Sequence, residues 1–374
     1  MNNSSVFSNA ILNWFRENGR ALPWRETKDP YAIWLSEIIM QQTRIAQGRE
    51  YWQRFMQAYP TVDDLAAASE DEVLKLWQGL GYYSRARNLH AAAQQIVALG
   101  HFPDTLDGIK GLKGVGDYTA AAIGSIAFDL PAAVVDGNVY RVLSRYFGIS
   151  TPINTTQGKK EFTALAQSLL PEASAERIRP NEFGMELSPV SAYNQAIMDF
   201  GAIQCTPQSP GCLLCPLADT CEALRSGRID QLPVKQKTLK IKTRHLCYIY
   251  IRCKQAGSAS PLVALHRRGE GDIWQGLWEP FNASLPDDSQ PAGLADIQRL
   301  LHLSSLDGLR LLAHDVKHVL THRILLADFY LLDADVRPVL PPDYLWVSEA
   351  DIADYAVPRL IELLLNRTLI IEKV

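Results

Sequence analysis

This sequence of 374 residues lacks several features that define large classes of protein. Its first residues, MNNSSVFSNAILNWF, lack the basic start and the clean apolar core of a signal peptide. It has no run of about 18 uncharged apolar residues, which argues against a membrane span. Cysteine is scarce, with six residues. We therefore expect a cytoplasmic protein with no membrane segment, in which thiols stay reduced.

An excess of positive charge is also missing, because the formal net charge is −4. This excludes a general basic field, so any contact with DNA has to come from local geometry. The one basic run, VKQKTLKIKTR, lies within residues 226–244, which hold six basic side chains and one acidic side chain. The simplest interpretation of this run is a solvated linker.

The pattern of apolar residues along the chain changes at this basic run. Before it, apolar residues recur at a spacing of three and four, which predicts helices in the segments 9–18, 31–59, 71–80, 85–99 and 119–128. After it, short β-rich runs at 245–253, 261–267 and 324–334 precede a helical tail at 357–366. We expect a multi-domain protein with an all-α domain at 1–225, a basic linker at 226–240 and a smaller α+β domain at 241–374.

Four of the six cysteines stand in one stretch, CTPQSPGCLLCPLADTC, with the spacing Cys205-x6-Cys212-x2-Cys215-x5-Cys221. Where thiols are reduced, such crowding indicates a metal centre more than disulfides. A structural zinc site usually draws on two separated short-spaced pairs, and one such pair is present here. Ligation from a single stretch, with a proline after one ligand, favours an iron–sulfur cluster. Zinc remains the alternative.

The segment GLKGVGDYTAAAIGSIAF (111–128) is typical of a tight turn followed by a helix. Gly114 and Gly116 permit backbone conformations that other residues resist, and they leave N–H groups accessible at the start of the helix. Such a helix start can accept a phosphate without a lysine patch, which reconciles DNA binding with the negative net charge. A plain structural turn is the alternative.

Glu37 is the first candidate for chemistry. In a helix its neighbours are mostly apolar: Ile33, Trp34, Met40 and Gln41. Removal from water on such a face raises the pKa of a carboxyl group and can keep it protonated, as a general acid requires. An ion-paired or edge-exposed glutamate is the alternative.

Asp136 is the second candidate, because an apolar run ends there and a helix is expected to begin just beyond Asn138. An aspartate before a helix is most often an N-cap. It could also present a fixed negative charge to the cavity that Glu37 faces. The pair would then supply the acid and the cation stabiliser that cleavage of a glycosidic bond needs.

Six blocks in order resemble MutY-type adenine DNA glycosylases of the endonuclease III superfamily: LPWR, SEIIMQQT, GLGYYSRARNL, VGDYTAAAI, VVDGNVYRVLSR and NQAIMDFGA. The cysteine stretch resembles the cluster loop of that superfamily, and 111–128 resembles its helix-hairpin-helix element. The resemblance implies an adenine glycosylase that carries a structural [4Fe-4S] cluster, and we expect it to be a monomer. Its implied partner is double-stranded DNA that contains A·8-oxoguanine or A·G mispairs.

The resemblance also implies roles for individual residues. Glu37 would protonate the flipped adenine, and Asp136 would stabilise the deoxyribosyl cation or capture it covalently. Support for these two would come from Tyr118 and Asn138, and contacts to the base from Trp24, Arg25 and Gln195. The residues implied to contact DNA are Gln42, Thr43, Tyr82, Gly114 and Gly116, and of these Gln42 and Tyr82 would wedge into the duplex. For Trp24 and Tyr82, a packing aromatic is the alternative.

The C-terminal part, with DIWQGLWEPF, resembles the Nudix-like domain that these enzymes carry, which is implied to recognise 8-oxoguanine. The Phe-Ser-His loop of the family corresponds to Leu320, Thr321 and His322, and strand residues without DNA contact are the alternative. The acidic Nudix helix with its paired glutamates is missing, since NASLPDDSQPAGLADIQRL follows instead. Without those carboxylates we expect no magnesium site and no pyrophosphohydrolysis.

Two other functions remain as hypotheses. An endonuclease III-like glycosylase/lyase that acts on oxidised pyrimidines needs a lysine amine for its Schiff base. Tyr118 stands where the lyase branch has that lysine, so we expect a monofunctional glycosylase. Lys113 stands where the family usually has proline, which places an amine near the site. A non-catalytic iron–sulfur DNA-binding protein is the third hypothesis, and it leaves Glu37 and Asp136 without a use.

Overall fold

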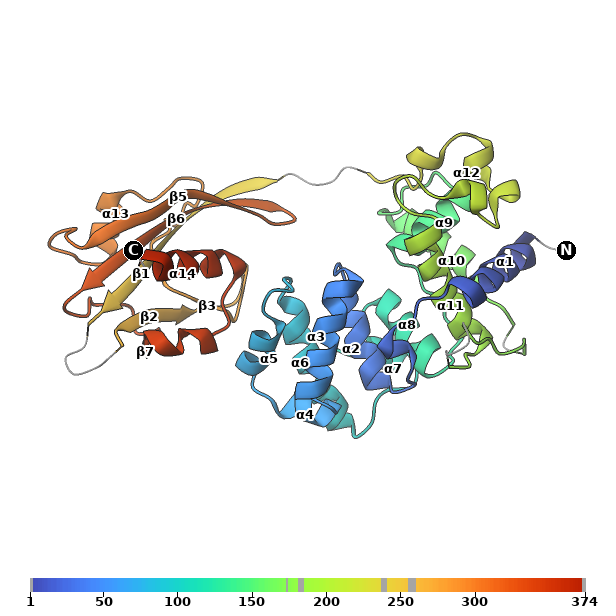
Figure 1. The fold of residues 1–374 in the computed structure, drawn as a ribbon, viewed down its shortest axis with the longest axis horizontal. Coiled ribbons are helices and arrows are strands. Elements are labelled where there is room, and N and C mark those ends of the chain that lie inside the picture. Colours follow the sequence, from blue (N-terminus) through green and yellow to red (C-terminus); the bar gives the residue numbers. More distant parts are fainter. Residues whose placement is uncertain (1–2, 173, 181–184, 237–240, 255–259, 372–374) are drawn as a thin grey trace. The chain divides into compact units, whose positions relative to one another are not determined.

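The computed structural model describes residues 3–172, 174–180, 185–236, 241–254 and 260–371 (Figure 1). The chain divides into two compact units. The first unit comprises Met1–Ala67 and Asn88–Lys237, and the second unit comprises Ala68–Arg87 and Thr238–Val374. No described helix is long and apolar enough to cross a membrane.

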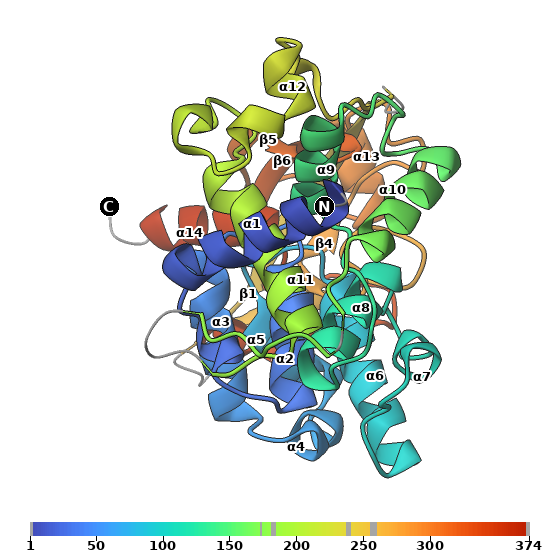
Figure 2. The ribbon, with the colours of Figure 1, turned by 90° about the vertical axis from the view of Figure 1, so that its right-hand side faces the viewer.

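The first unit is built from helices, as the apolar spacing predicts. Its elements are α1 Asn3–Asn18, η1 Pro23–Arg25, α2 Pro30–Met40, α3 Ile45–Ala58, α4 Val62–Ala67, α7 Leu106–Lys110, α8 Asp117–Ala127, α9 Gly137–Phe147, α10 Thr156–Ser168, α11 Pro189–Asp199, the π-helical η2 Phe200–Gln204, η3 Cys212–Leu214, η4 Ala218–Thr220, α12 Glu222–Arg225 and η5 Ile229–Gln231. The apolar faces of α1, α8, α9, α10 and α11 share one core. Figure 2 shows α1 lying across α11, and these two helices are in contact.

The helical segment expected at 31–59 is two helices, and the continuous interpretation is wrong. Helix α2 ends at Met40 and α3 begins at Ile45. Between them Gln42 has φ +57, in the left-handed region that reverses the chain. The sequence MQQTRI contains no glycine or proline that could mark this turn.

The expected linker is partly anchored to the first unit. Arg145 of α9 donates hydrogen bonds from Nε to the carbonyls of Ile229 (3.0 Å) and Leu232 (3.1 Å). The amide of Ile153 donates to the carbonyl of Val234 at 3.0 Å. Residues 229–234 of the basic segment are therefore held by α9 and by the loop after it. Residues 237–240 of the expected linker lie outside the described residues.

The second unit contains α5 Glu70–Trp77, the start of α6 Ser84–Leu99 and a mixed sheet. The sheet order is β3-β2-β1-β6-β5, with β4 paired to β1 and β7 paired to β2. The described strands are β1 Lys242–Cys253, β2 Leu262–Arg267, β3 Trp278–Glu279, β4 Phe281–Asn282, β5 Leu309–Val319, β6 Arg323–Ala334 and β7 Tyr344–Ser348. Strands β1 and β6 are parallel, and the other pairs are antiparallel.

Helices cover both faces of this sheet. Tyr248 of β1 faces the core that includes Leu360 of α14 Arg359–Ile371. The neighbouring Ile249 faces the other core, which includes Ile297 of α13 Leu294–Leu300. Burial on both faces explains the near-continuous apolar run LCYIYI in β1. The short 3₁₀ segment η6 Glu349–Asp354 follows β7.

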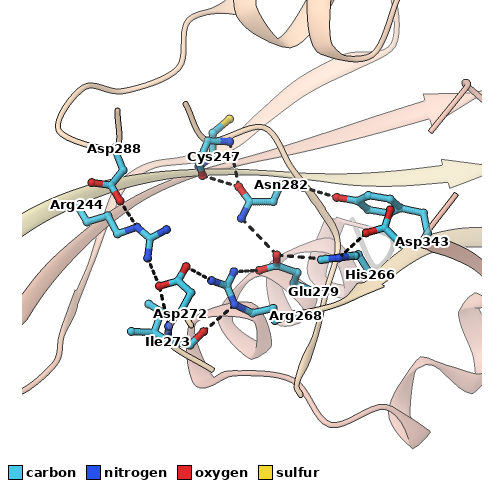
Figure 3. Close-up of polar contacts among 12 residues, drawn as sticks. Arg244, Cys247, His266, Arg268, Asp272, Ile273, Glu279, Asn282, Asp288 and Asp343 are labelled. Carbon is cyan, nitrogen blue, oxygen red and sulfur yellow. Dashed lines mark hydrogen bonds and ion pairs between the residues drawn. The ribbon is translucent and has the colours of Figure 1, made fainter. Parts of the chain in front are cut away.

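A chain of ion pairs fixes the loop between β2 and β3 (Figure 3). Arg268 donates from Nη1 to Glu279 at 2.5 Å and from Nη2 to Asp272 at 2.6 Å. Arg244 donates to the other oxygen of Asp272 at 2.6 Å and forms an ion pair with Asp288. The buried carboxylate of Glu279 is thus committed to an arginine. Helix α13 holds a single acid, Asp296, which pairs with Arg299.

Candidate active site

Glu37 of α2 and Tyr118 of α8 form the centre of the site. The Tyr118 hydroxyl donates a hydrogen bond of 2.8 Å to Glu37 Oε2 and lies 3.6 Å from Met198 Sδ. Burial raises the pKa of Glu37, and the negative charge of Asp136 adds to this shift. The Tyr118 hydrogen bond and the positive charge of Arg25 act in the opposite direction. The outcome is a raised pKa, which suits a carboxyl group that has to keep its proton.

Asp136 is the N-cap of α9, so the capping interpretation is confirmed. Its Oδ1 accepts from the backbone N–H of Val139 at 2.7 Å, and its Oδ2 accepts from Asn138 Nδ2 at 2.8 Å. Burial raises the pKa of Asp136, whereas these hydrogen bonds favour its charged form. Helix α9 begins at Gly137, one residue before Asn138. Asp136 therefore has a fixed orientation, and its charge acts on Glu37.

A series of hydrogen bonds leads from Asp136 to the cysteine loop. Arg141 donates from Nη2 to Asn138 Oδ1 at 2.8 Å. The same guanidinium donates from Nε to the carbonyl of Cys205 at 2.8 Å. Asn138 is thus held between a catalytic candidate and the cysteine loop.

The residues implied to bind the base lie on two elements. Trp24 and Arg25 form η1, where Trp24 is buried and its ring centroid lies 5.8 Å from that of Trp52. Gln195 of α11 is 1% exposed and donates from Nε2 to Ser191 at 3.2 Å. Its buried Oε1 has no hydrogen-bond partner among the described residues. A buried amide oxygen without a partner is costly unless a ligand supplies the donor.

Sequence reasoning missed Asp199, although it lies in the block NQAIMDFGA. Its carboxylate is fully buried and pairs with Arg25 and Arg20. A charged residue at the end of an otherwise uncharged, buried helix was the available signal, but the two partners stand more than 170 residues earlier.

The four cysteines surround one small cavity. Cys205, Cys212, Cys215 and Cys221 all line a cavity of about 30 Å³ with Arg145. Burial raises the pKa of Cys215 to about 11, and the neighbouring cysteines add to the shift. Four thiolates therefore need a cationic centre between them. Arg145 contributes one positive group, with Nη1 at 3.4 Å from Cys205 Sγ.

The spread of the sulfurs bears on the kind of centre. Among the residues that the structure describes, the one group of three or more His, Cys, Asp or Glu ligand atoms within 4.8 Å of one another is His314, Asp315 and Asp328. No three of the described sulfurs are therefore that close. A single tetrahedral zinc holds its sulfurs about 3.8 Å apart. The donor set thus fits a multi-iron cluster better than one zinc ion. The other two cysteines, Cys247 and Cys253, are buried in β1.

The expected hairpin lies between α7 and α8. Gly114 has φ +78, and a Cβ there would lie 2.7 Å from Asn88 Cβ. Gly116 is the N-cap of α8 and has no side-chain capping bond, so the first N–H groups of α8 are open to an acceptor. Lys113 is exposed on this turn. Of the implied wedge residues, Gln42 and Tyr82 each have positive φ and an exposed side chain. Thr43 follows Gln42 and is partly buried.

Tyr82 and the predicted recognition loop meet within the second unit. The Tyr82 hydroxyl and Thr321 Oγ1 are 2.8 Å apart. Leu320, Thr321 and His322 form the turn between β5 and β6, which the Leu320 amide closes by donating to the carbonyl of Arg323 at 2.8 Å. Thr321 and His322 are exposed, whereas Leu320 packs against the sheet core. These residues line an open cavity of about 720 Å³.

Comparison with known proteins agrees with this arrangement. A family model described as HhH-GPD superfamily base excision DNA repair protein matches residues 35–172, and a NUDIX domain model matches residues 247–367. The adenine DNA glycosylase of Mus musculus is 34% identical over 94% of this chain and 76% of its own length. The chain belongs to the adenine DNA glycosylase family.

Other relatives and structures are consistent with this membership. The adenine DNA glycosylase of Buchnera aphidicola subsp. Baizongia pistaciae is 34% identical over 73% of this chain and 72% of its own length. A solved thermostable thymine-DNA glycosylase superposes with a TM-score of 0.52 at 30% identity, over 60% of this chain and 97% of its own. A trapped endonuclease III–DNA covalent intermediate shares the fold, with a TM-score of 0.50 at 22% identity, over 61% of this chain and 99% of its own. The expected fold class, a helix-hairpin-helix glycosylase domain with a Nudix-like α+β domain, is confirmed.

Proposed function

We propose that this member of the adenine DNA glycosylase family hydrolyses the N-glycosidic bond of adenine opposite 8-oxoguanine or guanine in double-stranded DNA. The observation that carries the proposal is the pairing of Glu37 with Asp136. One carboxyl group has a raised pKa and a phenol as hydrogen-bond donor. Burial raises the pKa of the other, Asp136, as well, but a backbone N–H and a side-chain amide donate to it and favour its charged form. These are the two environments that an acid and a cation stabiliser require.

In the proposed reaction the adenine is first extruded from the duplex, and Trp24, Arg25 and Gln195 bind it. Extrusion costs a few kcal/mol, roughly, which wedging by Gln42 and Tyr82 offsets. Glu37 then gives its proton to the adenine ring as the bond between C1′ and the base nitrogen breaks. The bonding electrons leave with the base. Asp136 remains anionic and stabilises the cationic sugar.

The second half of the reaction restores the enzyme. Water adds its oxygen to C1′ and returns a proton to Glu37, so the products are free adenine and an abasic site. No amine takes part, because Tyr118 carries a phenol and its hydroxyl is already bonded to Glu37. We therefore propose a monofunctional enzyme that leaves the sugar–phosphate strand intact.

The DNA contacts follow from the open backbone of the hairpin. The N–H groups at the start of α8, after Gly114 and Gly116, would bind a phosphate without added positive charge. The turn that holds Thr321 and His322, with Tyr82 beside it, would recognise the base opposite the adenine. The hydroxyl of Thr321 can donate and accept a hydrogen bond, and the adjoining cavity gives a base room to enter.

The four cysteines would hold a [4Fe-4S] cluster, which supplies structural order to the loop 205–221 and takes no part in bond cleavage. Arg145 and Arg141 would fix that loop against α9 through the carbonyls of Thr206 and Cys205. We further propose that the functional domains are 1–225 and 241–374 with a basic linker between them. Because the cluster needs reduced thiols, we infer a cytoplasmic enzyme. That the enzyme is a monomer stays a prediction.

A single-turnover assay on a set of duplexes tests this proposal. The set contains adenine opposite 8-oxoguanine, guanine or thymine, together with a thymine glycol duplex, each analysed with and without hot alkali. We expect release of adenine opposite 8-oxoguanine and guanine. The strand should break only when the enzyme-treated duplex is then heated with alkali. Thymine glycol excision with spontaneous strand cleavage would support the glycosylase/lyase instead, and binding without excision would support a non-catalytic protein.

A further inference from the structure

One buried carboxylate holds two arginines at the edge of the candidate site. Asp199 is the last residue of α11 and is fully buried. Its two oxygens accept from Arg25 in a fork, Nη1 to Oδ2 and Nη2 to Oδ1, each at 2.8 Å. They also accept from Arg20, through Nε at 2.9 Å, through the backbone N–H at 3.0 Å and through Nη2.

This arrangement commits part of the Arg25 guanidinium and leaves the rest available. Nη1 also donates to the carbonyl of Arg20 at 3.2 Å. Arg25 has five N–H donors in a rigid plane. Its Nε–H and one N–H of Nη2 have no partner among the residues that the structure describes. The fork on Asp199 therefore fixes the plane in which those remaining donors point.

One member of this group, Arg25, acts electrostatically on Glu37. Arg20, Arg25 and Asp199 together carry a net charge of +1. Glu37 lies close enough for the charge of Arg25 to affect its ionisation. The other groups that act on Glu37 are Tyr118 from α8 and Asp136 from the start of α9. Removing the charge of Asp199 would leave two uncompensated cations, which would favour the ionised form of Glu37.

We propose that Asp199 is a positioning residue for base excision: it fixes the guanidinium of Arg25 and cancels its charge, so that Glu37 keeps its proton. This inference rests on the proposed function of Glu37 as the general acid. It assigns Asp199 no contact with the substrate. Arg20 shares the carboxylate, and it sets how much of the negative charge remains to balance Arg25.

Three variants of the full chain separate charge from structure. Asp199→Asn raises the net charge of the group to +2, Arg20→Gln lowers it to 0, and the double variant restores +1. When a reaction needs a protonated general acid, its rate falls as the pH rises through the pKa of that acid. Single-turnover adenine excision is therefore measured between about pH 5.5 and 9.5, with circular dichroism at each pH to verify folding.

The expected result is a pair of opposite shifts. Asp199→Asn should move the alkaline limb of the rate profile down by about one pH unit, which is a roughly tenfold loss of rate above the midpoint. Arg20→Gln should move that limb up, and the double variant should return it close to the wild-type position. Lys28→Gln is the matched control, because it removes a cation that pairs with Asp129 and does not share the carboxylate of Asp199. It should leave the limb in place.

Other outcomes would overturn the positioning role. An equal loss of rate at every pH in Asp199→Asn would show a structural effect alone. Shifts of the limb in the same direction for Asp199→Asn and Arg20→Gln would also contradict it. If Asp199→Asn does not fold, the upward shift in Arg20→Gln decides the question, and a profile that stays in place refutes the proposal. Wild-type excision is measured first, so its absence would refute the proposed function instead.

Discussion

Tyr118 and Glu37 are joined by a hydrogen bond of 2.8 Å from the phenol to Oε2. Burial and the negative charge of Glu37 raise the pKa of Tyr118 well above its usual value, so the phenol stays neutral and can donate at any pH the enzyme meets. The bond joins α2 to α8, the helix that begins at the hairpin. The proton donor is thereby tied to the element proposed to hold the DNA backbone.

Replacing Tyr118 by phenylalanine should change the pH profile in a defined direction. The hydrogen bond lowers the pKa of Glu37, so its loss should raise that pKa and move the alkaline limb of the excision rate to higher pH. The maximal rate should fall about tenfold or more because the carboxyl group is less well positioned. Tyr140→Phe on α9 is the control, and its profile should match the wild type. A limb that moves down in Tyr118→Phe would contradict this interpretation.

Asp136→Asn should separate chemistry from capping. An asparagine caps a helix about as well as an aspartate, because its side-chain oxygen can still accept from Val139, so the melting temperature should change little. The rate of adenine excision should fall by about two orders of magnitude or more, since the negative charge beside the cationic sugar is gone. Asp136→Ala should in addition lose roughly 1 kcal/mol of unfolding free energy. Excision at a near wild-type rate in Asp136→Asn would remove this residue from the mechanism.

The cysteine loop predicts a brown protein. Anaerobically purified protein should contain about four irons per chain and absorb near 400 nm, roughly where thiolate–iron charge transfer is expected. Cys215→Ser should lower the iron content, whereas Cys253→Ser in β1 should leave it unchanged. Stoichiometric zinc without iron would refute the cluster assignment.

The two hairpin glycines should respond differently to alanine. Gly114 has φ +78 and a close neighbour in Asn88, so Gly114→Ala should lose about 1–2 kcal/mol of unfolding free energy and weaken binding to duplex DNA. Gly116 has φ −98, and a Cβ there would meet no atom within 4 Å. Gly116→Ala should therefore keep its stability, as measured by chemical unfolding. Equal losses in both variants would contradict the structural distinction.

Local patterns predicted most of the elements because apolar periodicity is a local property of the chain. Helix α6 and strand β6 lie within a few residues of the expected segments. The turn at Gln42 was not predicted from the sequence, because glutamine is not a residue type that indicates a left-handed backbone conformation. Predicting a contact between residues that are distant in the sequence needs more than a local pattern. In the first unit Glu37 contacts Tyr118, 81 residues away, and in the second unit Tyr82 contacts Thr321, 239 residues away.

Because local patterns do not show contacts between distant residues, the cysteines were easier to interpret than Asp199. Four ligands within 17 residues show their relationship in their spacing, so a metal centre is visible in the sequence. The partners of Asp199 are 174 and 179 residues distant, and no periodicity connects them. Family resemblance indicated Glu37 and Asp136 as a pair. Only the structure shows which neighbouring groups shift the pKa values of these two residues.

The most direct test of the account is adenine excision by Glu37→Gln. The substitution keeps the size of the side chain and a hydrogen-bond acceptor for Tyr118, but it removes the transferable proton. Single-turnover rates on a duplex with adenine opposite 8-oxoguanine are compared with the wild type, and duplex affinity is measured alongside. We predict unchanged affinity within a few-fold and a rate lower by about two to four orders of magnitude. A rate close to that of the wild type, with normal binding, would contradict the proposal that Glu37 protonates the leaving adenine.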